Sequence, residues 1–145
     1  RQRCDLAAQL GALLLTRKHD YAALIANEMG KPIKQGVAEI EKCARLCSHY
    51  AEAAESYLAG RQVASSATKS FVTHEPLGIV FGIMPWNFPF WQVFRFAIPA
   101  LIAGNGALLK HAPISTGAAL EIESLFKDAG FPQSIFRTLV ITNEE

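Results

Sequence analysis

The segment PWNFP, residues 85–89, places one polar side chain, Asn87, in an apolar and proline-flanked stretch. Its two prolines interrupt a strand and bias their neighbours away from helix, which predicts a turn. An asparagine amide presents N–H donors without adding a titrating group, so Asn87 can hold a ligand oxygen. The alternative is that Asn87 only satisfies the backbone of this turn.

Two cations follow Asn87 along the chain. Arg95 is the one charged residue between residues 77 and 109, and burying it alone would be costly. Its guanidinium therefore binds an anionic ligand, pairs with a structural acid or reaches the surface, and its geometry suits a carboxylate. Lys110 comes directly after the apolar run, where it either contacts a ligand or points to solvent.

Cysteines and histidines offer a weaker candidate site. Cys43 and Cys47 would lie one turn apart on a helix, but His49 points elsewhere and no fourth metal ligand is evident. We therefore interpret the two cysteines as buried structural thiols and expect no metal site. The remaining histidines lack a paired acid or nucleophile motif and are interpreted as surface or hydrogen-bonded residues: His19, His74 and His111.

A strand–helix–strand pattern surrounds Asn87. Residues 79–83 (IVFGI) predict a short buried strand, residues 89–103 a helix that Pro99 should kink, and residues 107–109 a second strand. This order is typical of the βαβ unit of a parallel sheet. Its first turn, which holds Asn87, is where α/β proteins place ligands.

The pattern continues towards the C-terminus. Ser115 or Thr116 can cap a further helix, and residues 136–141 predict a third strand. The apolar positions expected on that helix are Leu120, Ile122, Leu125 and Phe126. The predicted fold class is α/β, with N-terminal helices followed by part of a Rossmann-like parallel sheet whose edge is left open.

Three apolar stripes at helical spacing precede the sheet. Asp5 and Asp20 are expected to cap the first two helices, Gly30 ends the second, and the third runs to near Gly60. The stripes are interpreted as core packing: Leu6, Leu10, Leu13 and Leu14; Leu24, Ile25 and Met29; Ile33, Val37, Ile40, Ala44, Cys47 and Tyr50.

These elements divide the chain into three segments. Residues 1–60 are helical, residues 75–145 form a partial β-α-β-α-β sheet, and residues 61–74 connect them. The connecting segment is small and polar, which is typical of a solvated linker and makes weak strand sequence. The chain begins Arg1-Gln2-Arg3 without a methionine, so we expect its natural start to be missing.

Composition argues against several functions. The 145 residues can bury one core, and a net charge of +1 gives no reason to expect a nucleic-acid partner. Residues 77–94 are uncharged and long enough to be considered as a membrane span. Their prolines and glycines would leave backbone groups without hydrogen bonds in lipid, and Asn87 and Gln92 would leave side-chain amides without partners, so no membrane span is expected. Three thinly spread cysteines are typical of reduced thiols and favour a cytoplasmic location.

Several segments, in order and spacing, resemble the NAD(P)-dependent aldehyde dehydrogenase superfamily. The longest is EPLGIVFGIMPWNFP at residues 75–89, and the others are EMGKP at residues 28–32, AGN at 103–105, LLK at 108–110 and AGFP at 129–132. Within the superfamily, the sequence is most similar to succinate-semialdehyde dehydrogenases. The resemblance covers nearly the whole chain but only an early part of the family's fold.

The resemblance implies a reaction. A cysteine thiolate attacks an aldehyde, the tetrahedral oxyanion expels hydride to the nicotinamide of NAD or NADP, and water releases the acid. Asn87 matches the asparagine that stabilises the oxyanion. Lys110 matches the lysine that contacts the adenosine ribose, and the backbone before Asn87 would line the same cofactor cleft: Ile83, Met84, Pro85 and Trp86. Residues 1–60 would then be the N-terminal helices of a cofactor domain.

Two positions depart from the family. Pro113 replaces a carboxylate that many members place three residues after the lysine, which leaves NAD and NADP both open. Phe96 replaces a lysine found nine residues after the asparagine in many members, so any role of that lysine is absent.

Arg95 sets the expected substrate. Succinate-semialdehyde dehydrogenases have an arginine at this offset that binds the substrate carboxylate, and Phe88 is expected to contact the substrate too. Asn87 and Arg95 would lie about 12 Å apart if the segment were helical throughout. A small carboxylated aldehyde could then bridge them.

The resemblance also implies missing parts and partners. The family's catalytic cysteine, base glutamate and glycine-rich cofactor loop lie beyond Glu145, so the chain alone is expected to be inactive and the complete enzyme a dimer or tetramer. In the family, the stretch matching residues 61–74 contributes extended strands that take part in subunit association, which is the alternative to a solvated linker. The alternative hypothesis is a non-catalytic nucleotide-binding or assembly module that retains only the half-sheet.

Overall fold

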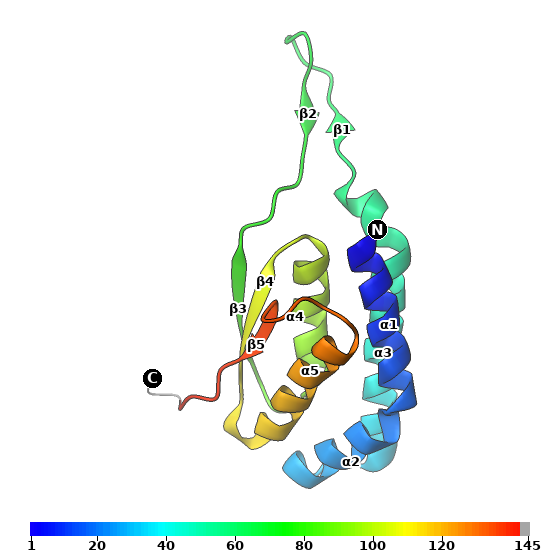
Figure 1. The fold of residues 1–145 in the computed structure, drawn as a ribbon, viewed down its shortest axis with the longest axis vertical. Helices are drawn as coiled ribbons and strands as arrows, with labels where there is room; N and C mark the ends of the chain where they lie inside the picture. Colours follow the sequence, from blue (N-terminus) through cyan, green and yellow to red (C-terminus); the bar gives the residue numbers. More distant parts are fainter. Residues whose placement is uncertain (143–145) are drawn as a thin grey trace.

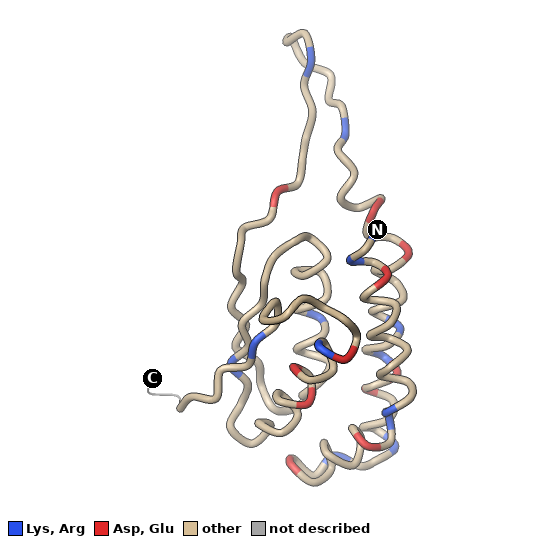
Figure 2. Tube along the Cα trace, viewed as in Figure 1, with Lys and Arg blue, Asp and Glu red and all other residues tan. Residues whose placement is uncertain are grey.

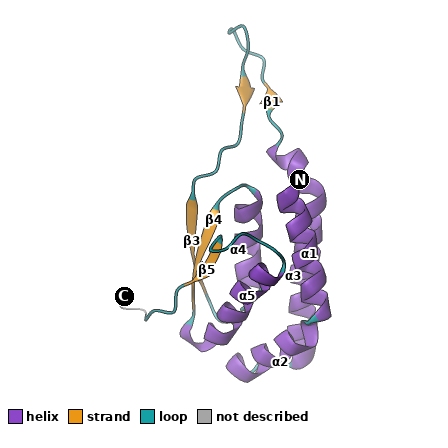
Figure 3. Cartoon of the chain, viewed as in Figure 1, coloured by secondary structure: helices purple, strands orange, loops and turns teal. Residues whose placement is uncertain are grey.

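The computed structural model describes residues 1–142 and arranges them in three layers (Figure 3). The outer layer contains α1 (Gln2–Thr16), α2 (Lys18–Met29) and α3 (Ile33–Leu58). The middle layer contains α4 (Trp91–Ile102) and α5 (Thr116–Asp128), which follows the short helix η1 (Pro113–Ser115). The third layer is a sheet of β3 (Ile79–Met84), β4 (Gly106–His111) and β5 (Phe136–Thr138). The predicted fold class is confirmed; residues 143–145 of the predicted sheet segment lie outside the described residues.

The three N-terminal helices form because each has an apolar stripe to bury. α1 packs along α3, and Leu10, Leu14 and Ile40 are fully buried. α2 ends at Gly30, whose φ of +76° suits glycine, as predicted. The predicted caps were wrong: α1 begins at Gln2 and α2 at Lys18, so Asp5 and Asp20 lie inside the first turns. Carboxylates are favourable there because the helix N-terminus is positive.

The sheet is parallel, in the order β3-β4-β5, and β3 is an edge strand. Alternation along β3 turns Gly82 towards α4, where the ring of Phe96 lies 2.6 Å from the position that a Cβ at residue 82 would take. Only glycine allows the helix to pack this closely. Ile79, Phe81 and Ile83 point to the opposite face, where they are exposed.

α4 begins at Trp91 rather than at Pro89, and it continues through Pro99 to Ile102, close to the predicted end at residue 103. The chain then reverses at Gly104, which has a φ of +100°. Asn105 links this turn to the residues just before β3. Its Oδ1 accepts hydrogen bonds from the N–H groups of Leu77 (2.7 Å) and Gly78 (3.1 Å).

Residues 61–74 form a hairpin that projects from the body of the molecule (Figure 1). Its strands, β1 (Arg61–Gln62) and β2 (Phe71–Val72), pair antiparallel. The segment therefore contains extended strands of only two residues each, and it is almost entirely exposed to solvent.

Two further expectations were wrong in detail. β5 ends at Thr138 instead of continuing to residue 141; Leu139 N–H still donates to Leu109 O (2.8 Å), and the chain then leaves the sheet. Ile33 and Leu120 are exposed although their spacing placed them on buried stripes, and alanines take the core positions around Leu120. No helix within residues 1–142 is long and apolar enough to cross a membrane.

Charged residues are unevenly distributed between the outer helices and the βαβ unit. In Figure 2 acidic and basic residues are interspersed along α1, α2 and α3. The unit from β3 to Leu109 has Arg95 as its one charged residue.

Candidate functional site

The carboxyl ends of β3 and β4 lie side by side and bring predicted site residues together. Ile83 is the register partner of Lys110, and Met84 is the partner of His111. Pro85, Trp86, Asn87 and Phe88 follow immediately in the loop between β3 and α4. Ligands of parallel α/β sheets bind at this end of the strands, so the arrangement fits a binding site.

Asn87 combines an exposed side chain with a firmly held backbone. Its carbonyl oxygen accepts a hydrogen bond of 2.8 Å from Lys31 Nζ. Within residues 1–142, its side-chain amide is exposed and makes no hydrogen bond, so it is available to a ligand. We refer to residues 87–91 as the Asn87 turn.

Lys31 and Glu39 form a buried ion pair beneath the Asn87 turn, with side chains 7% and 2% exposed. Glu39 Oε1 accepts hydrogen bonds from the N–H groups of Phe90 and Trp91, both at 2.9 Å, and so caps the start of α4. Glu39 Oε2 accepts from Lys31 Nζ. Lys31 Nζ also lies 3.9 Å from the centroid of the Phe88 ring.

His111 holds the turn from the side of the sheet. The N–H of Ala112 donates to His111 Nδ1 (2.8 Å), so Nε2 carries the proton and donates to Pro89 O (2.9 Å). Burial lowers the pKa of His111 below its ordinary value, which favours this neutral form. The prediction of a hydrogen-bonded histidine is correct for His111.

Lys110 lies on the same sheet face as Ile83 but is only 8% exposed, and its Nζ is 3.4 Å from His111 O. The alternative of a lysine pointing to solvent is therefore not supported. Ile83 is 69% exposed and Trp86 52% exposed, so the strand end offers an apolar surface beside a lysine. Such a surface fits the sugar and rings of a dinucleotide.

Arg95 lies in the second turn of α4 and is exposed. The concern about burying its charge therefore does not arise within residues 1–142. Because α4 begins only at Trp91, the segment from Asn87 to Arg95 is not helical throughout, and the spacing estimated for an unbroken helix does not apply. The exposed guanidinium can receive an anionic ligand.

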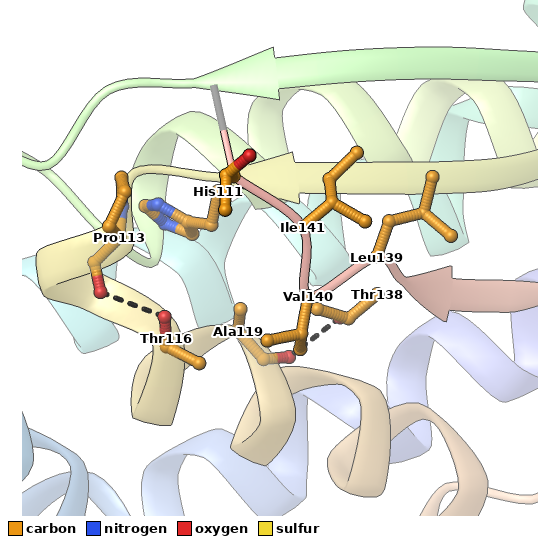
Figure 4. A pocket seen from close by; sticks show the side chains of 9 residues that line it. His111, Pro113, Thr116, Ala119, Thr138, Leu139, Val140 and Ile141 are labelled. Carbon is orange, nitrogen blue, oxygen red and sulfur yellow. Dashed lines mark hydrogen bonds between the residues drawn. The ribbon is translucent and has the colours of Figure 1, made fainter. Parts of the chain in front are cut away.

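A cavity of about 340 Å³ opens beyond the carboxyl ends of β4 and β5 (Figure 4). Its lining residues are His111, Pro113, Thr116, Ala119, Thr138, Leu139, Val140, Ile141 and Thr142. Thr116 Oγ1 donates to Pro113 O (2.8 Å) and Thr138 Oγ1 to Ala119 O (3.0 Å), so neither hydroxyl is left unsatisfied. The cavity does not include Asn87 or Arg95, but His111 belongs to its wall and also holds the Asn87 turn.

The cysteines are in the helical core. Cys43 and Cys47 are fully buried, as expected of structural thiols. Burial raises the pKa of Cys43 well above its ordinary value and that of Cys47 to about 12, which makes both poor nucleophiles. Within residues 1–142, no group of histidines, cysteines and carboxylates has the arrangement of a metal site.

Comparison with known proteins agrees with this geometry. The family model described as "Aldehyde dehydrogenase family" matches residues 1–145. The chain belongs to the aldehyde dehydrogenase family.

Two relatives of this aldehyde dehydrogenase chain are named for one substrate. A probable succinate-semialdehyde dehydrogenase [NADP(+)] of Synechocystis sp. is 50% identical over 140 residues, covering 97% of this chain and 31% of that protein. Succinate semialdehyde dehydrogenase [NAD(P)+] Sad of Escherichia coli K12 is 43% identical over 142 residues, covering 98% and 31%. The chain thus spans about 31% of the length of these curated relatives.

Solved structures agree on the fold. Succinic semialdehyde dehydrogenase from Streptococcus pyogenes, in complex with NADP+, superposes with a TM-score of 0.96 at 27% identity, over 99% of this chain and 31% of that one. An NAD-dependent aldehyde dehydrogenase from Sinorhizobium meliloti gives a TM-score of 0.89 at 31% identity, over 95% and 28%.

Sequence reasoning missed the residues that hold the aldehyde dehydrogenase motif in place. Lys31 had a signal, because Gly-Lys-Pro belongs to the family resemblance, but its partner could not be read from the sequence. Glu39 looked like one polar residue beside the apolar stripe of α3. His111 was assigned no place at the site.

Proposed function

We propose that the chain is the N-terminal part of an enzyme that oxidises succinate semialdehyde, or a similar small carboxylated aldehyde, to the acid with NADP+ or NAD+. The names of relatives at 50% and 43% identity support this substrate. The observation that carries the proposal is the Asn87 turn, where an exposed amide stands on a fixed backbone at the carboxyl end of β3.

Asn87 acts as an oxyanion donor. Its N–H groups bind the aldehyde oxygen and stabilise the negative charge that develops when a nucleophile attacks. A preorganised donor contributes most when it need not move during the reaction. The hydrogen bonds that fix the backbone of the Asn87 turn support this role. The nucleophile and the base lie outside this chain, so residues 1–145 alone do not complete the reaction.

The cofactor binds across the ends of β3 and β4. Ile83, Met84, Pro85 and Trp86 line its cleft, and Lys110 contacts the adenosine ribose. When bound, the nicotinamide accepts the hydride. Pro113 provides no carboxylate against a 2′-phosphate, so we expect the enzyme to use NADP+ and to tolerate NAD+.

Arg95 binds the carboxylate of the substrate, with Phe88 beside it. The exposed guanidinium can form two hydrogen bonds with a carboxylate, while Asn87 holds the aldehyde oxygen. Two fixed ends would select both the length and the orientation of the substrate.

The test compares two aldehydes in the full-length enzyme. Arg95→Leu should lower kcat/KM for succinate semialdehyde. The loss should correspond to roughly 2–5 kcal/mol of transition-state binding free energy, the scale for removing one partner of a desolvated charge pair. Butanal, which lacks the carboxylate, should be oxidised about as well as before. The measurement is the ratio of the two specificity constants in each protein.

Arg45→Leu, which removes an exposed arginine from α3, is the matched control and should leave the ratio unchanged. Equal losses for both aldehydes in Arg95→Leu would make Arg95 structural and the substrate class wrong. A full-length protein that binds nucleotide but oxidises no aldehyde would instead support the non-catalytic module.

The complete enzyme is further proposed to be a cytoplasmic homo-oligomer, a dimer or a tetramer, in which the β1–β2 hairpin contributes to subunit association. The projection of the hairpin from the body supports this role (Figure 1).

A further inference from the structure

Within residues 1–142, the hydrogen bonds and the cation–π contact that the Lys31–Glu39 pair makes with other residues all lie in one short stretch of chain. Apart from their mutual ion pair, the two side chains contact Asn87 O, the Phe88 ring and the N–H groups of Phe90 and Trp91. The pair therefore holds the Asn87 turn at both its beginning and its end.

Stability alone does not explain such a pair. Removing two charges from water is costly, and apolar residues of similar volume are often as stabilising. Hydrogen bonds have preferred distances and angles, so a buried charged pair can fix the position and orientation of the backbone groups that it binds. Apolar residues cannot do this. Here the fixed groups include the carbonyl of Asn87 itself.

We propose that Lys31 and Glu39 are positioning residues for the aldehyde reaction, which set the orientation of the Asn87 amide through the backbone of the Asn87 turn. The proposal rests on the proposed function of Asn87 as oxyanion donor. Neither side chain needs to touch the substrate. Their effect should appear in the chemical step, because a misplaced oxyanion donor weakens transition-state binding more than substrate binding.

The chain offers a matched control pair. Lys18 and Glu41 form a second lysine–glutamate pair between the helices of the outer layer, with Nζ and Oε1 2.7 Å apart. Glu41 lies only two residues after Glu39 on α3, and within residues 1–142 neither Lys18 nor Glu41 forms a hydrogen bond or ion pair with the Asn87 turn. The same substitutions can therefore be made at both places.

The experiment uses the full-length enzyme and two double variants. Lys31→Met with Glu39→Gln leaves no unpaired buried charge and keeps an oxygen for the N–H groups of α4, but it removes the ammonium that holds Asn87 O. We expect kcat to fall about 10–10²-fold, the usual scale for a displaced catalytic group. KM values for aldehyde and cofactor should change less than about twofold. Lys18→Met with Glu41→Gln should leave kcat within about twofold of wild type.

A third comparison separates positioning from general support of the fold. In an Asn87→Ala background, the Lys31→Met, Glu39→Gln change should reduce kcat by less than about threefold, because the amide that it misplaces is already absent. A loss as large as in wild type would overturn the proposal, as would unchanged kcat with Asn87 present. If the double variant does not fold, Lys31→Arg keeps the ion pair and moves the donor; it should lower kcat at least about fivefold, and an unchanged kcat would overturn the proposal.

Hydrogen exchange reads the position of the turn without reference to activity. In the Lys31→Met, Glu39→Gln variant, peptides covering residues 86–92 should exchange faster than in wild type, whereas peptides of α1 and α5 should not. Unchanged exchange at residues 86–92 would contradict the proposal. A wild-type enzyme that oxidises no aldehyde, but whose turn still loosens in the variant, would refute the proposed function and leave the structural role of the pair standing.

Discussion

The amide of Asn87 is exposed, while the backbone beneath it is held by buried groups, so a substitution there can remove the amide without disturbing the turn. We expect Asn87→Ala in the full-length enzyme to lower kcat by about 10²–10³-fold, as for other single oxyanion donors. KM should change little, because the interaction strengthens only as charge develops. Steady-state kinetics with succinate semialdehyde measure both constants.

Asn27→Ala, at an exposed asparagine of α2, is the control and should have no effect. A near-normal kcat in Asn87→Ala would reduce Asn87 to a turn residue.

At the scale of residues, the sequence could predict that Asn87 and Lys110 lie at strand ends, but not which residues hold the Asn87 turn. Asn87 and Lys110 follow from local pattern and family resemblance, and both lie at the carboxyl ends of strands as expected. Lys31 lies 56 residues from Asn87, and Glu39 lies 51 residues from Phe90. Contacts between segments so far apart depend on how α3 packs against α4, and no local spacing predicts them.

Helices and strands also divide into features that local sequence predicts and features that depend on distant contacts. The βαβ unit was predictable, because apolar runs, prolines and glycines mark strands and turns locally. The cap of α5 was not, because it comes from a different helix: Glu28 of α2 accepts hydrogen bonds from the N–H groups of Gly117 (2.6 Å) and Ala118 (3.0 Å). Ser115, a predicted cap, makes no side-chain capping bond, and its buried Oγ has no hydrogen-bond partner among the described residues.

This difference predicts opposite effects on stability. Glu28→Ala should lower the free energy of unfolding by about 1–2 kcal/mol, because two N–H groups at the helix start lose their acceptor. Ser115→Ala should leave it unchanged or slightly raised, since it removes a buried hydroxyl without a partner. Denaturant midpoints of the full-length enzyme measure both. A larger loss for Ser115→Ala than for Glu28→Ala would restore serine as the cap.

At the scale of the whole molecule, residues 1–142 leave one face of the sheet uncovered. The helices all lie on the other side (Figure 1), and the open face carries Ile79, Phe81 and Ile83 beside the edge of β3. The open edge was predictable from the small number of strands. The exposed face was not, since the same short apolar run also fits a strand buried on both sides.

The 145-residue chain alone should therefore associate with itself in a concentration-dependent manner and show no aldehyde oxidation. Ile79→Lys places a charge on the open face and should raise the concentration needed for association about tenfold. Leu15→Lys, at an exposed apolar position of α1, should not. Analytical ultracentrifugation measures the association. Aldehyde oxidation by the pure chain would contradict the proposal that the nucleophile and the base lie outside residues 1–145.

The buried Lys31–Glu39 pair also bears on the order in which the protein is made. Synthesis proceeds from the N-terminus, so Lys31 and Glu39 leave the ribosome before residues 87–91 exist. Until those residues arrive, both charges can remain hydrated. Docking of the turn dehydrates them, and this is favourable only if the Asn87 carbonyl and the Phe90 and Trp91 N–H groups arrive in register. A turn docked one residue out of place would leave a buried charge without its partners, which is energetically costly. The early-synthesised pair therefore favours the correct register of residues 87–91 over shifted ones.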